Sequence, residues 1–188
     1  MIHRLLAGGI LAACALNAGC ATVAPKYNTD FDNVGKLRSA SLAPTRIGSI
    51  TKDPGAKHDV DALTLRGGTL QSPYGSYTAY LREALQQEFE DARLLDPSSQ
   101  LEVSGVLLQN DIDPGMSTGS ATAAARLSIR RGGTVVYEDA KSARIEWDSS
   151  FVGAIAIPKA NENYPKVLQK LLGEFYADPK FLAALKKD

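Results

Sequence analysis

The chain has 188 residues, 44% of them hydrophobic, and its 21 Lys and Arg residues balance 21 Asp and Glu residues. This length and composition predict one globular domain with a real hydrophobic core and argue against a disordered chain. The balanced charge argues against a nucleic-acid-binding protein, which needs a clustered basic surface.

The first twenty residues combine a basic start, an apolar run and small residues before a cysteine. His3 and Arg4 precede an apolar run that extends to about Leu16, and three further residues lead to Cys20. This order is typical of a cleaved bacterial lipoprotein signal, and the run is too short to span a bilayer, which needs about 20 apolar residues. We therefore predict that residues 1–19 are removed and that Cys20 carries the lipid.

Cys14 is an alternative lipidation site, because Leu11-Ala12-Ala13 before it matches the usual signal, whereas Asn17 stands where Leu is normal before Cys20. Cys20 is favoured because cleavage at Cys14 leaves an apolar run near the lower limit of about 7 to 15 residues. Both cysteines are followed by Ala and not by the Asp that retains enterobacterial lipoproteins in the inner membrane. With Ala21 as the sorting residue, the expected location is the outer membrane, facing the periplasm. An ordinary secretory signal and a Cys14–Cys20 disulfide in an uncleaved chain are further alternatives.

After such processing, the mature chain keeps few side chains of the types that act in catalysis. Both cysteines lie in the export segment, so the mature chain has no free thiol for a disulfide, a nucleophile or a metal site. His58 is then the one remaining histidine, and it lies in a polar stretch without further zinc or triad ligands. We expect no catalytic residues, no metal and no cofactor, and so no enzyme.

Residues 20–40 are polar and show no sustained periodicity. This pattern predicts a lipidated flexible tether, with a mean reach of roughly 20 to 30 Å. The single folded domain is expected to occupy residues 41–188.

The domain begins with a predicted strand within Leu42–Ile50, and a second strand or extended arm fits Val60–Leu70. Ser72-Pro73 then opens the clearest helix, since Ser is a good N-cap and Pro is tolerated at the first helical position. This helix is expected to end near Leu94-Leu95. Its apolar residues recur at helical spacing: Tyr77, Leu81, Ala84, Leu85, Phe89 and Ala92.

Three further strands follow this helix. Leu101–Ile112 is apolar on both faces, as in a central strand. The composition of residues 113–120 predicts a mobile loop. An alternating segment from Ala123 then turns at Gly132-Gly133 into a second one, which continues through Ala143–Trp147 and indicates an antiparallel hairpin.

Two helices end the chain. The first is expected to start within Asn161–Pro165 and carries an apolar face from Val167 to Phe175, and a short helix begins at Asp178-Pro179. Grouped strands and helices of this kind predict an α+β fold. We expect an antiparallel sheet of about four to five strands with two main helices packed on one face.

Several local sequences resemble the YajG-like family of bacterial lipoproteins, over about residues 44–186. The residues that carry the resemblance are Gly68–Ser72 leading to Tyr80–Leu85, Leu101–Val103, Ala123–Ile129, Tyr137–Ala143 and Asp178–Leu182. The resemblance implies an envelope lipoprotein and carries no catalytic residues with it. A broader likeness is to the auxiliary lipoproteins of envelope ABC transport systems, which combine a lipid anchor with a small α+β domain.

Aromatic residues supply the candidate contact surface. Tyr74, Tyr77 and Tyr80 follow one helix edge, where they pack against the core or form a partner surface. Trp147 stands between Glu146 and Asp148 on a strand, which fits a core Trp better than a sugar-cleaving acid pair.

The leading hypothesis is a lipid-anchored periplasmic accessory module that acts on another envelope protein through protein–protein contacts. The first alternative is a carrier or sensor of a small amphiphile or cell-wall glycan, with a cavity near Trp147 and residues 113–120. The second is a hydrolase that needs neither metal nor thiol. No nucleic acid is expected, and the sequence leaves open whether the chain is a monomer or a homodimer.

Overall fold

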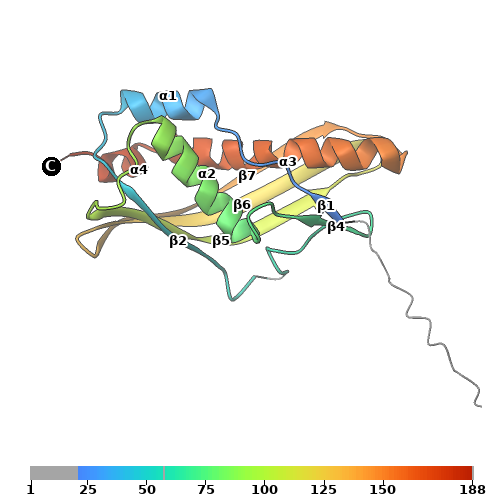
Figure 1. The fold of residues 1–188 in the computed structure, drawn as a ribbon, viewed down its shortest axis with the longest axis horizontal. Helices are drawn as coiled ribbons and strands as arrows, with labels where there is room; N and C mark the ends of the chain where they lie inside the picture. The colour runs from blue at the N-terminus through green and yellow to red at the C-terminus, as the bar shows by residue number, and fades with distance from the viewer. Residues whose placement is uncertain (1–20, 57, 188) are drawn as a thin grey trace, which may run out of the picture.

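The computed structural model describes residues 21–56 and 58–187, and its largest element is a four-stranded sheet covered by helices on one face (Figure 1). In order across the sheet, the strands are β2 (Arg46–Lys52), β5 (Leu101–Asp113), β6 (Thr118–Arg131) and β7 (Thr134–Asp148). This arrangement confirms the predicted α+β fold. The predicted hairpin is confirmed as well, since β6 and β7 pair antiparallel on either side of Gly132-Gly133.

The sheet is not purely antiparallel, as the sequence led us to expect. β2 pairs parallel with β5, with Ile47 opposite Val103. Two parallel neighbours need a crossover connection, and α2 (Tyr77–Asp91) supplies it between β2 and β5. Alternation along a single strand shows which side chains are buried but carries no information on strand direction, so the sequence could not predict this pairing.

Two helices cover one face of the main sheet, as predicted. α2 lies against β2, and α3 (Gly153–Tyr176) lies along β6 and β7. Alternate residues of β6 face these helices and are buried: Ala121, Ala123, Ala125, Leu127 and Ile129. The alanines leave room for the larger side chains of α3, such as Leu168 and Phe175, in the core.

α3 starts eight residues before the predicted range, at Gly153 rather than Asn161. The buried stripe continues upstream of Val167 through Ala156, Ala160 and Tyr164, at a spacing of four. Pro158 and Pro165 lie inside the helix. Each removes a backbone hydrogen bond at a cost of about 3 kcal/mol, which the long buried face offsets.

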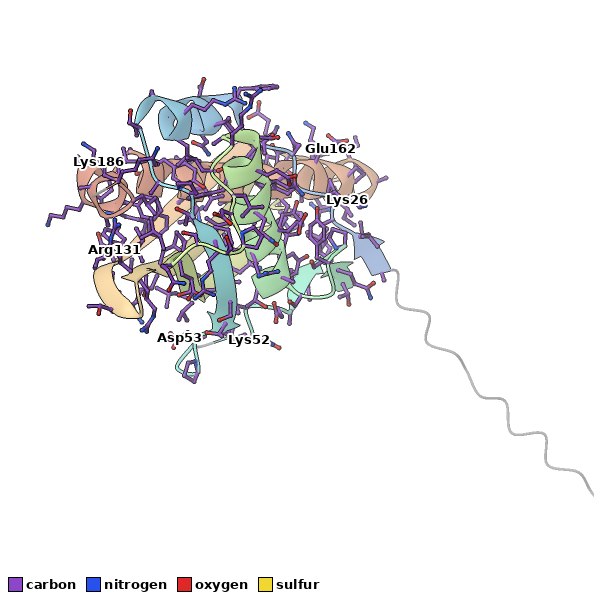
Figure 2. The ribbon with its side chains drawn as sticks, turned by 60° about the vertical axis from the view of Figure 1, so that its left-hand side comes forward. Lys26, Lys52, Asp53, Arg131, Glu162 and Lys186 are labelled. Carbon is purple, nitrogen blue, oxygen red and sulfur yellow. The ribbon has the colours of Figure 1, made fainter. Side chains whose placement is uncertain are left out.

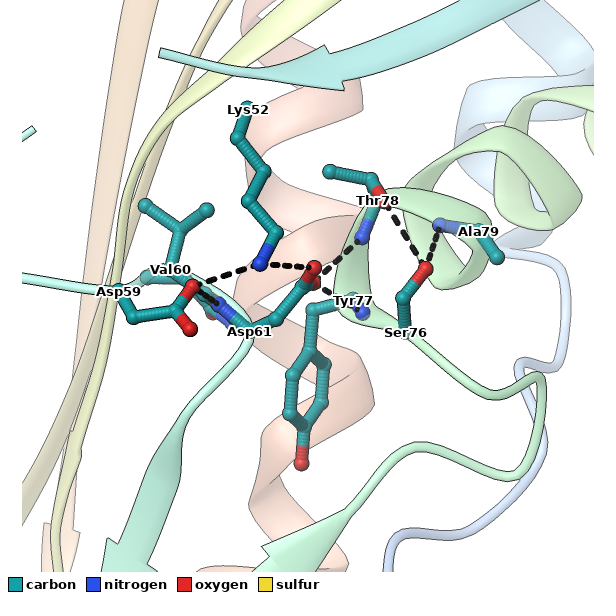
Figure 3. Close-up of polar contacts among 9 residues, drawn as sticks. Lys52, Asp59, Val60, Asp61, Ser76, Tyr77, Thr78 and Ala79 are labelled. Carbon is teal, nitrogen blue, oxygen red and sulfur yellow. Dashed lines mark hydrogen bonds and ion pairs between the residues drawn. The ribbon is translucent and has the colours of Figure 1, made fainter. Parts of the chain in front are cut away.

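The N-terminal end of α2 is capped from two sides (Figure 3). Ser76, rather than the predicted Ser72, is the N-cap, and its side chain accepts from the amide of Ala79. Asp61 accepts from the amides of Tyr77 at 2.6 Å and Thr78 at 3.1 Å, so the first three amides of the helix have partners. Figure 3 also shows Lys52, which bridges Asp61 at 3.0 Å and Asp59 at 2.9 Å.

A smaller three-stranded sheet packs beside the main one. Its strands, in order, are β1 (Ala21–Val23), β4 (Gly68–Gln71) and β3 (Leu63–Leu65). β1 pairs parallel with β4, with Ala21 opposite Thr69, and β3 pairs antiparallel with β4. Arg66 and Gly67 both have positive φ, as a two-residue type I′ hairpin turn requires.

The prediction of a flexible tether over residues 20–40 is wrong for residues 21–40. After β1, the chain forms α1 (Phe31–Ser39), which packs across α2 and α3. Val34 and Leu37 are buried beneath it, and Tyr27 is buried before it. The segment is short and polar, and its order comes from contacts with residues far away in the sequence. Such contacts produce no periodic pattern, so the sequence alone could not predict this structure.

The chain ends with α4 (Pro179–Ala184), whose Asp178 N-cap accepts from the amide of Lys180, as the Asp-Pro start predicts. No helix in the described part of the chain is long and apolar enough to cross a bilayer. The predicted signal, residues 1–19, and the candidate cysteines Cys14 and Cys20 lie outside the described residues.

Candidate functional site

A cluster of five tyrosines holds the N-terminal segment, residues 21–40, against the domain. Its members, called the tyrosine cluster below, are Tyr27, Tyr74, Tyr77, Tyr80 and Tyr164, with neighbouring ring centroids 5.0 to 6.3 Å apart. The hydroxyl of Tyr80 donates to Pro25 O at 2.7 Å, and the hydroxyl of Tyr74 accepts from Tyr27 N at 3.2 Å. Each phenol thus joins an apolar ring to a specific backbone group.

The two remaining phenols of the tyrosine cluster fix other parts of the core. Tyr77 donates to Leu70 O at 2.9 Å, which ties α2 to β4 beside β1. Tyr164 donates to the Asn110 side chain at 3.0 Å, and the Asn110 amide donates to Val60 O at 2.9 Å. The small sheet, the main sheet and α3 therefore meet at the same group of rings.

Glu88 is a second attachment point for the N-terminal segment, and it is fully buried. Its Oε1 accepts from the Tyr27 hydroxyl at 2.5 Å and from the Asn33 amide nitrogen at 3.2 Å. Asn33 also donates to Gln169 O on α3 at 2.8 Å, and Gln169 donates to Asn28 O at 2.8 Å. Side chains of two helices thus clamp residues 27–33.

The buried carboxyl of Glu88 is electrostatically unusual. Burial raises its pKa, and the hydrogen bonds from Tyr27 and Asn33 offset only part of that rise. Burial and the nearby Glu88 charge raise the pKa of Tyr27, so this phenol stays protonated and remains a donor.

The predicted aromatic contact surface is wrong at Tyr80. Tyr80 is fully buried in the tyrosine cluster and therefore cannot form a partner surface, while Tyr74 is half-buried beside it. Trp147 is half-buried too, on the helix-covered side of the sheet opposite Gly119. A side chain at position 119 would overlap the indole ring, so Gly119 makes room for Trp147. Tyr80 is thus a packing residue, while a contact role for the half-buried Tyr74 and Trp147 stays a prediction.

The hollow beside β5 does not coincide with the predicted ligand cavity. It has a volume of about 530 Å³ and lies between residues 53–56, residues 58–60 and β5, with a mixed lining of apolar residues and polar ones such as Asp53, His58 and Asp111. Trp147 is not part of that lining. The predicted mobile loop over residues 113–120 is shorter in the structure, because β5 extends to Asp113 and β6 already starts at Thr118.

Arg66 gathers three loops at one end of the molecule. From the β3–β4 turn, its guanidinium donates to Phe151 O and Ser150 O, each at 2.7 Å, and to Gly115 O. Ser149 adds a backbone bond to Ser117 O at 2.7 Å. The β5–β6 loop and the β7–α3 loop are therefore held together.

Sequence reasoning missed these attachment residues. A signal existed for Glu88, because it occupies a core position of the α2 stripe, between Leu85 and Ala92, where an apolar residue belongs. No comparable signal exists for Arg66, since its acceptors are backbone carbonyls of distant loops.

The other face of the main sheet carries no helix in the described part of the chain (Figure 1). We call this surface the open face. Its central side chains are mainly small or polar: Ser104, Val106, Thr122, Ala124, Arg126 and Ser142. Part of the β7 edge is covered by α3, because Lys170 donates to Arg144 O at 3.0 Å and Lys159 to Asp148 O at 3.1 Å.

Within the described ranges, no group of three or more His, Cys, Asp or Glu side chains is placed to hold a metal ion. Glu146, which the sequence places beside Trp147, is exposed and pairs with Arg144 at 3.0 Å. This exposed pair lacks the closed, desolvated surroundings in which carboxylates act as acid–base catalysts.

Comparisons with known proteins show the fold. No family model and no curated protein matches the chain. Protein XCC0632 from Xanthomonas campestris, described with the family model DUF330, is 12% identical over 87% of this chain and 96% of its own, with a TM-score of 0.59. A putative lipoprotein from Caulobacter crescentus is 13% identical over 80% of this chain and 98% of its own, at 0.42. A minor lipoprotein from Acinetobacter baumannii is 9% identical over 78% and 97%, at 0.43.

Proposed function

We propose that this protein is a lipid-anchored accessory module on the periplasmic side of the bacterial outer membrane, which presents its open face to another envelope protein. One observation carries the proposal. The lipoprotein signal predicts acylation of Cys20, and the next residue, Ala21, already pairs with Thr69 in a sheet. The lipid and the folded domain are thus separated by a single peptide bond.

The short connection has a mechanical consequence. A flexible tether would let the domain sample a range of distances and orientations, whereas a connection through β1 lets the lipid constrain both. The tyrosine cluster and Glu88 keep β1 and α1 in place, so a partner meets the open face at a defined height above the membrane. Such a fixed presentation suits an accessory subunit of a membrane-bound assembly.

The chemistry of the open face supports a protein partner. Its central side chains are short apart from Arg126, and the Arg126 guanidinium has no hydrogen-bond or ion-pair partner among the described residues. An exposed arginine among short side chains fits a protein surface that bears a carboxylate, because arginine pairs well with carboxylates at interfaces.

Site-specific photocrosslinking in the native envelope tests this proposal. A photoreactive residue replaces Thr122 on the open face, and a matched control replaces the exposed Glu90 on α2. We expect one discrete crosslinked product from position 122 and none from position 90. A product of twice the chain mass identifies the partner as a second copy. Equal labelling at both positions, or none at position 122, contradicts the proposal.

Anchoring is tested separately. Mass spectrometry of the mature N-terminal peptide is expected to show acyl chains on Cys20, and membrane fractionation is expected to place the protein with outer-membrane markers. An unmodified N-terminus that starts at another residue removes the anchor from the proposal.

A further inference from the structure

Several apolar side chains are exposed together at one end of the molecule. Met116 is 60% exposed in the β5–β6 loop, and Phe151, Val152 and Ile155 are 74%, 51% and 48% exposed at the start of α3. We call these four residues the apolar end. Large apolar side chains that protrude from neighbouring loops mark a contact with another apolar phase.

The apolar end has a fixed structure. Arg66 donates to the carbonyls of Ser150 and Phe151 and to Gly115 O, next to Met116. Ser149 bonds to both Ser117 and Pro114 across the two loops. The four side chains therefore project from one scaffold, and their common exposure is not the result of loosely held loops.

The N-terminus of the described chain lies at this same end. β1 runs parallel to β4, so Ala21 lies toward the β3–β4 turn that contains Arg66. One strand spacing and a two-residue turn separate Ala21 from Arg66, a distance of about 12 Å. Figure 1 shows β1 and the start of α3 together on the right-hand side of the molecule.

We infer that the apolar end inserts into the lipid bilayer beside the acylated cysteine and seats the domain end-on against the membrane. This inference rests on the proposed lipid anchor and adds a second contact to it. With Cys20 at the membrane surface, the chain brings Arg66 and the loops it holds to within a few residues' length of the lipid headgroups. Apolar side chains at a membrane interface enter the boundary between headgroups and acyl chains to a depth of about 5 to 10 Å.

The bilayer is the occupant that the geometry favours. An acyl chain on Cys20 keeps its lipid next to the apolar end at all times, whereas a second copy must be supplied by diffusion. The opposite end of the β6–β7 hairpin is about 40 Å away, given its length and the rise per residue of a strand. That end exposes Val136 and lies where Figure 2 labels Arg131 and Lys186, far from β1.

A methionine oxidation experiment tests the inference on the natural apolar end. Met116 is the one methionine left after removal of the signal, since Met1 is the other. In a Val136→Met variant, the two ends each carry one methionine on the same molecule. The acylated full-chain product is reconstituted into phosphatidylethanolamine–phosphatidylglycerol vesicles and treated with an oxidant that does not cross membranes. Mass spectrometry then gives the oxidation rate of each methionine.

Side-chain exposure alone predicts that Met116 oxidises at least as fast as Met at position 136, because Met116 is 60% and Val136 is 46% exposed. Insertion predicts the reverse, with Met116 oxidised about tenfold more slowly. Equal rates in protein that floats with the vesicles and carries the lipid overturn the inference and leave the anchor intact. Protection that disappears when the protein-to-lipid ratio is lowered assigns the contact to a second copy and also overturns it.

Two additional readouts separate failure of the anchor from failure of the insertion. An N-terminal peptide without acyl chains, together with loss of flotation, removes the anchor and with it this inference. A Phe151→Trp, Trp147→Phe variant supplies an independent probe, since its single tryptophan lies at the apolar end. Bromine atoms on the lipid acyl chains are expected to reduce its fluorescence about twofold, and unchanged fluorescence contradicts insertion.

Discussion

The two ends of the β6–β7 hairpin are built alike and expose different surfaces. At one end, Arg66 donates to backbone carbonyls of two loops, and at the other Arg131 donates to Ala184 O and to Lys186 O at 3.1 and 2.8 Å. The Arg131 end is rich in charged side chains and exposes Val135 and Val136 to 44% and 46%, whereas the Arg66 end exposes the larger Phe151 and Met116 side chains to 74% and 60%. An arginine can therefore order a loop end of this fold without an exposed aromatic or methionine side chain, so Phe151 and Met116 need an explanation of their own.

The largest expected effect on stability comes from the contacts that join the N-terminal segment to the domain. Tyr27→Ala removes a buried ring and the donor to Glu88, and we expect it to lower the free energy of unfolding by about 3 to 5 kcal/mol. Urea denaturation measures the loss, and limited proteolysis should show new cleavage within residues 21–40. Phe31→Ala is the matched control, since Phe31 belongs to the same segment and is 90% exposed. A change below about 0.5 kcal/mol is expected for the control, and an equal loss in both variants contradicts the assignment.

Glu88→Gln tests whether the buried carboxylate weakens the attachment at neutral pH. The folded-state pKa of Glu88 is raised above its unfolded value, near 4.3, so its contribution to stability is complete below that value and is lost as the pH rises through the folded-state pKa. Glutamine can accept from Tyr27 without a charge. We expect the variant to exceed the parent in stability by about 1 to 3 kcal/mol at pH 8, with the difference shrinking toward pH 5.

Asp178 titrates in a different range and does not obscure this measurement. Burial alone would raise its pKa, but bonds from Lys141, Lys180 N and Tyr137 lower it to about 2. Its contribution is therefore present above about pH 4 and is lost only as the pH falls toward 2. A Glu88→Gln difference that stays constant between about pH 5 and pH 8 refutes the assigned role of Glu88.

The paired variants Arg66→Gln and Arg131→Gln compare the two ends directly. Each loses charge-assisted bonds to backbone carbonyls, at an expected cost of about 1 to 2 kcal/mol. Hydrogen exchange should accelerate at residues 114–117 and 149–153 in the first variant and at residues 183–187 in the second. Methionine oxidation of Met116 in vesicles should change only in the first, and a common response at both ends would falsify their independence.

The smallest expected effect is at the N-terminal cap of α2, the helix across which α1 packs. Asp61→Ala leaves the amides of Tyr77 and Thr78 without their acceptor and should cost about 1 to 2 kcal/mol in thermal or urea unfolding. Lys52→Met removes only the ion pairs of the exposed Lys52 with Asp59 and Asp61, and a smaller loss than for Asp61→Ala is expected. A larger loss for Lys52→Met than for Asp61→Ala reverses the order that the contacts predict.

The parts of the fold that could be predicted from the sequence are those with regular patterns. Two patterns repeat over many residues and therefore predict local structure. They are the alternation in β6 and β7 with its glycine turn, and the apolar stripes of α2 and α3. The N-terminal segment could not be recognised in this way. Tyr27 and Asn28 find their partners 47 to 141 residues later, at Tyr74, Glu88 and Gln169. Order that depends on such long-range contacts leaves only a short polar stretch in the sequence.

The candidate site, too, could be predicted only where a local sequence pattern exists. The tyrosine spacing around the start of α2 was visible in the sequence, but only the structure shows that Tyr74 and Tyr80 hold the segment next to the predicted lipid. The exposed residues of the apolar end come from two loops about 35 residues apart in the chain, and Arg66 of the β3–β4 turn joins them. No local pattern connects such positions before the chain folds.

Hydrogen exchange of residues 21–40 in the acylated protein on vesicles tests the central claim most directly, because it distinguishes a packed segment from a tether. The amide of Ala24 donates to Gln71 O at 2.8 Å, that of Tyr27 to the Tyr74 hydroxyl and that of Val34 to Asp30 O at 3.0 Å. We predict that these amides are protected to a degree comparable with the strands of the main sheet. Exchange of the whole segment at the rate of an unfolded peptide, while the sheet stays protected, contradicts the account and restores the flexible tether.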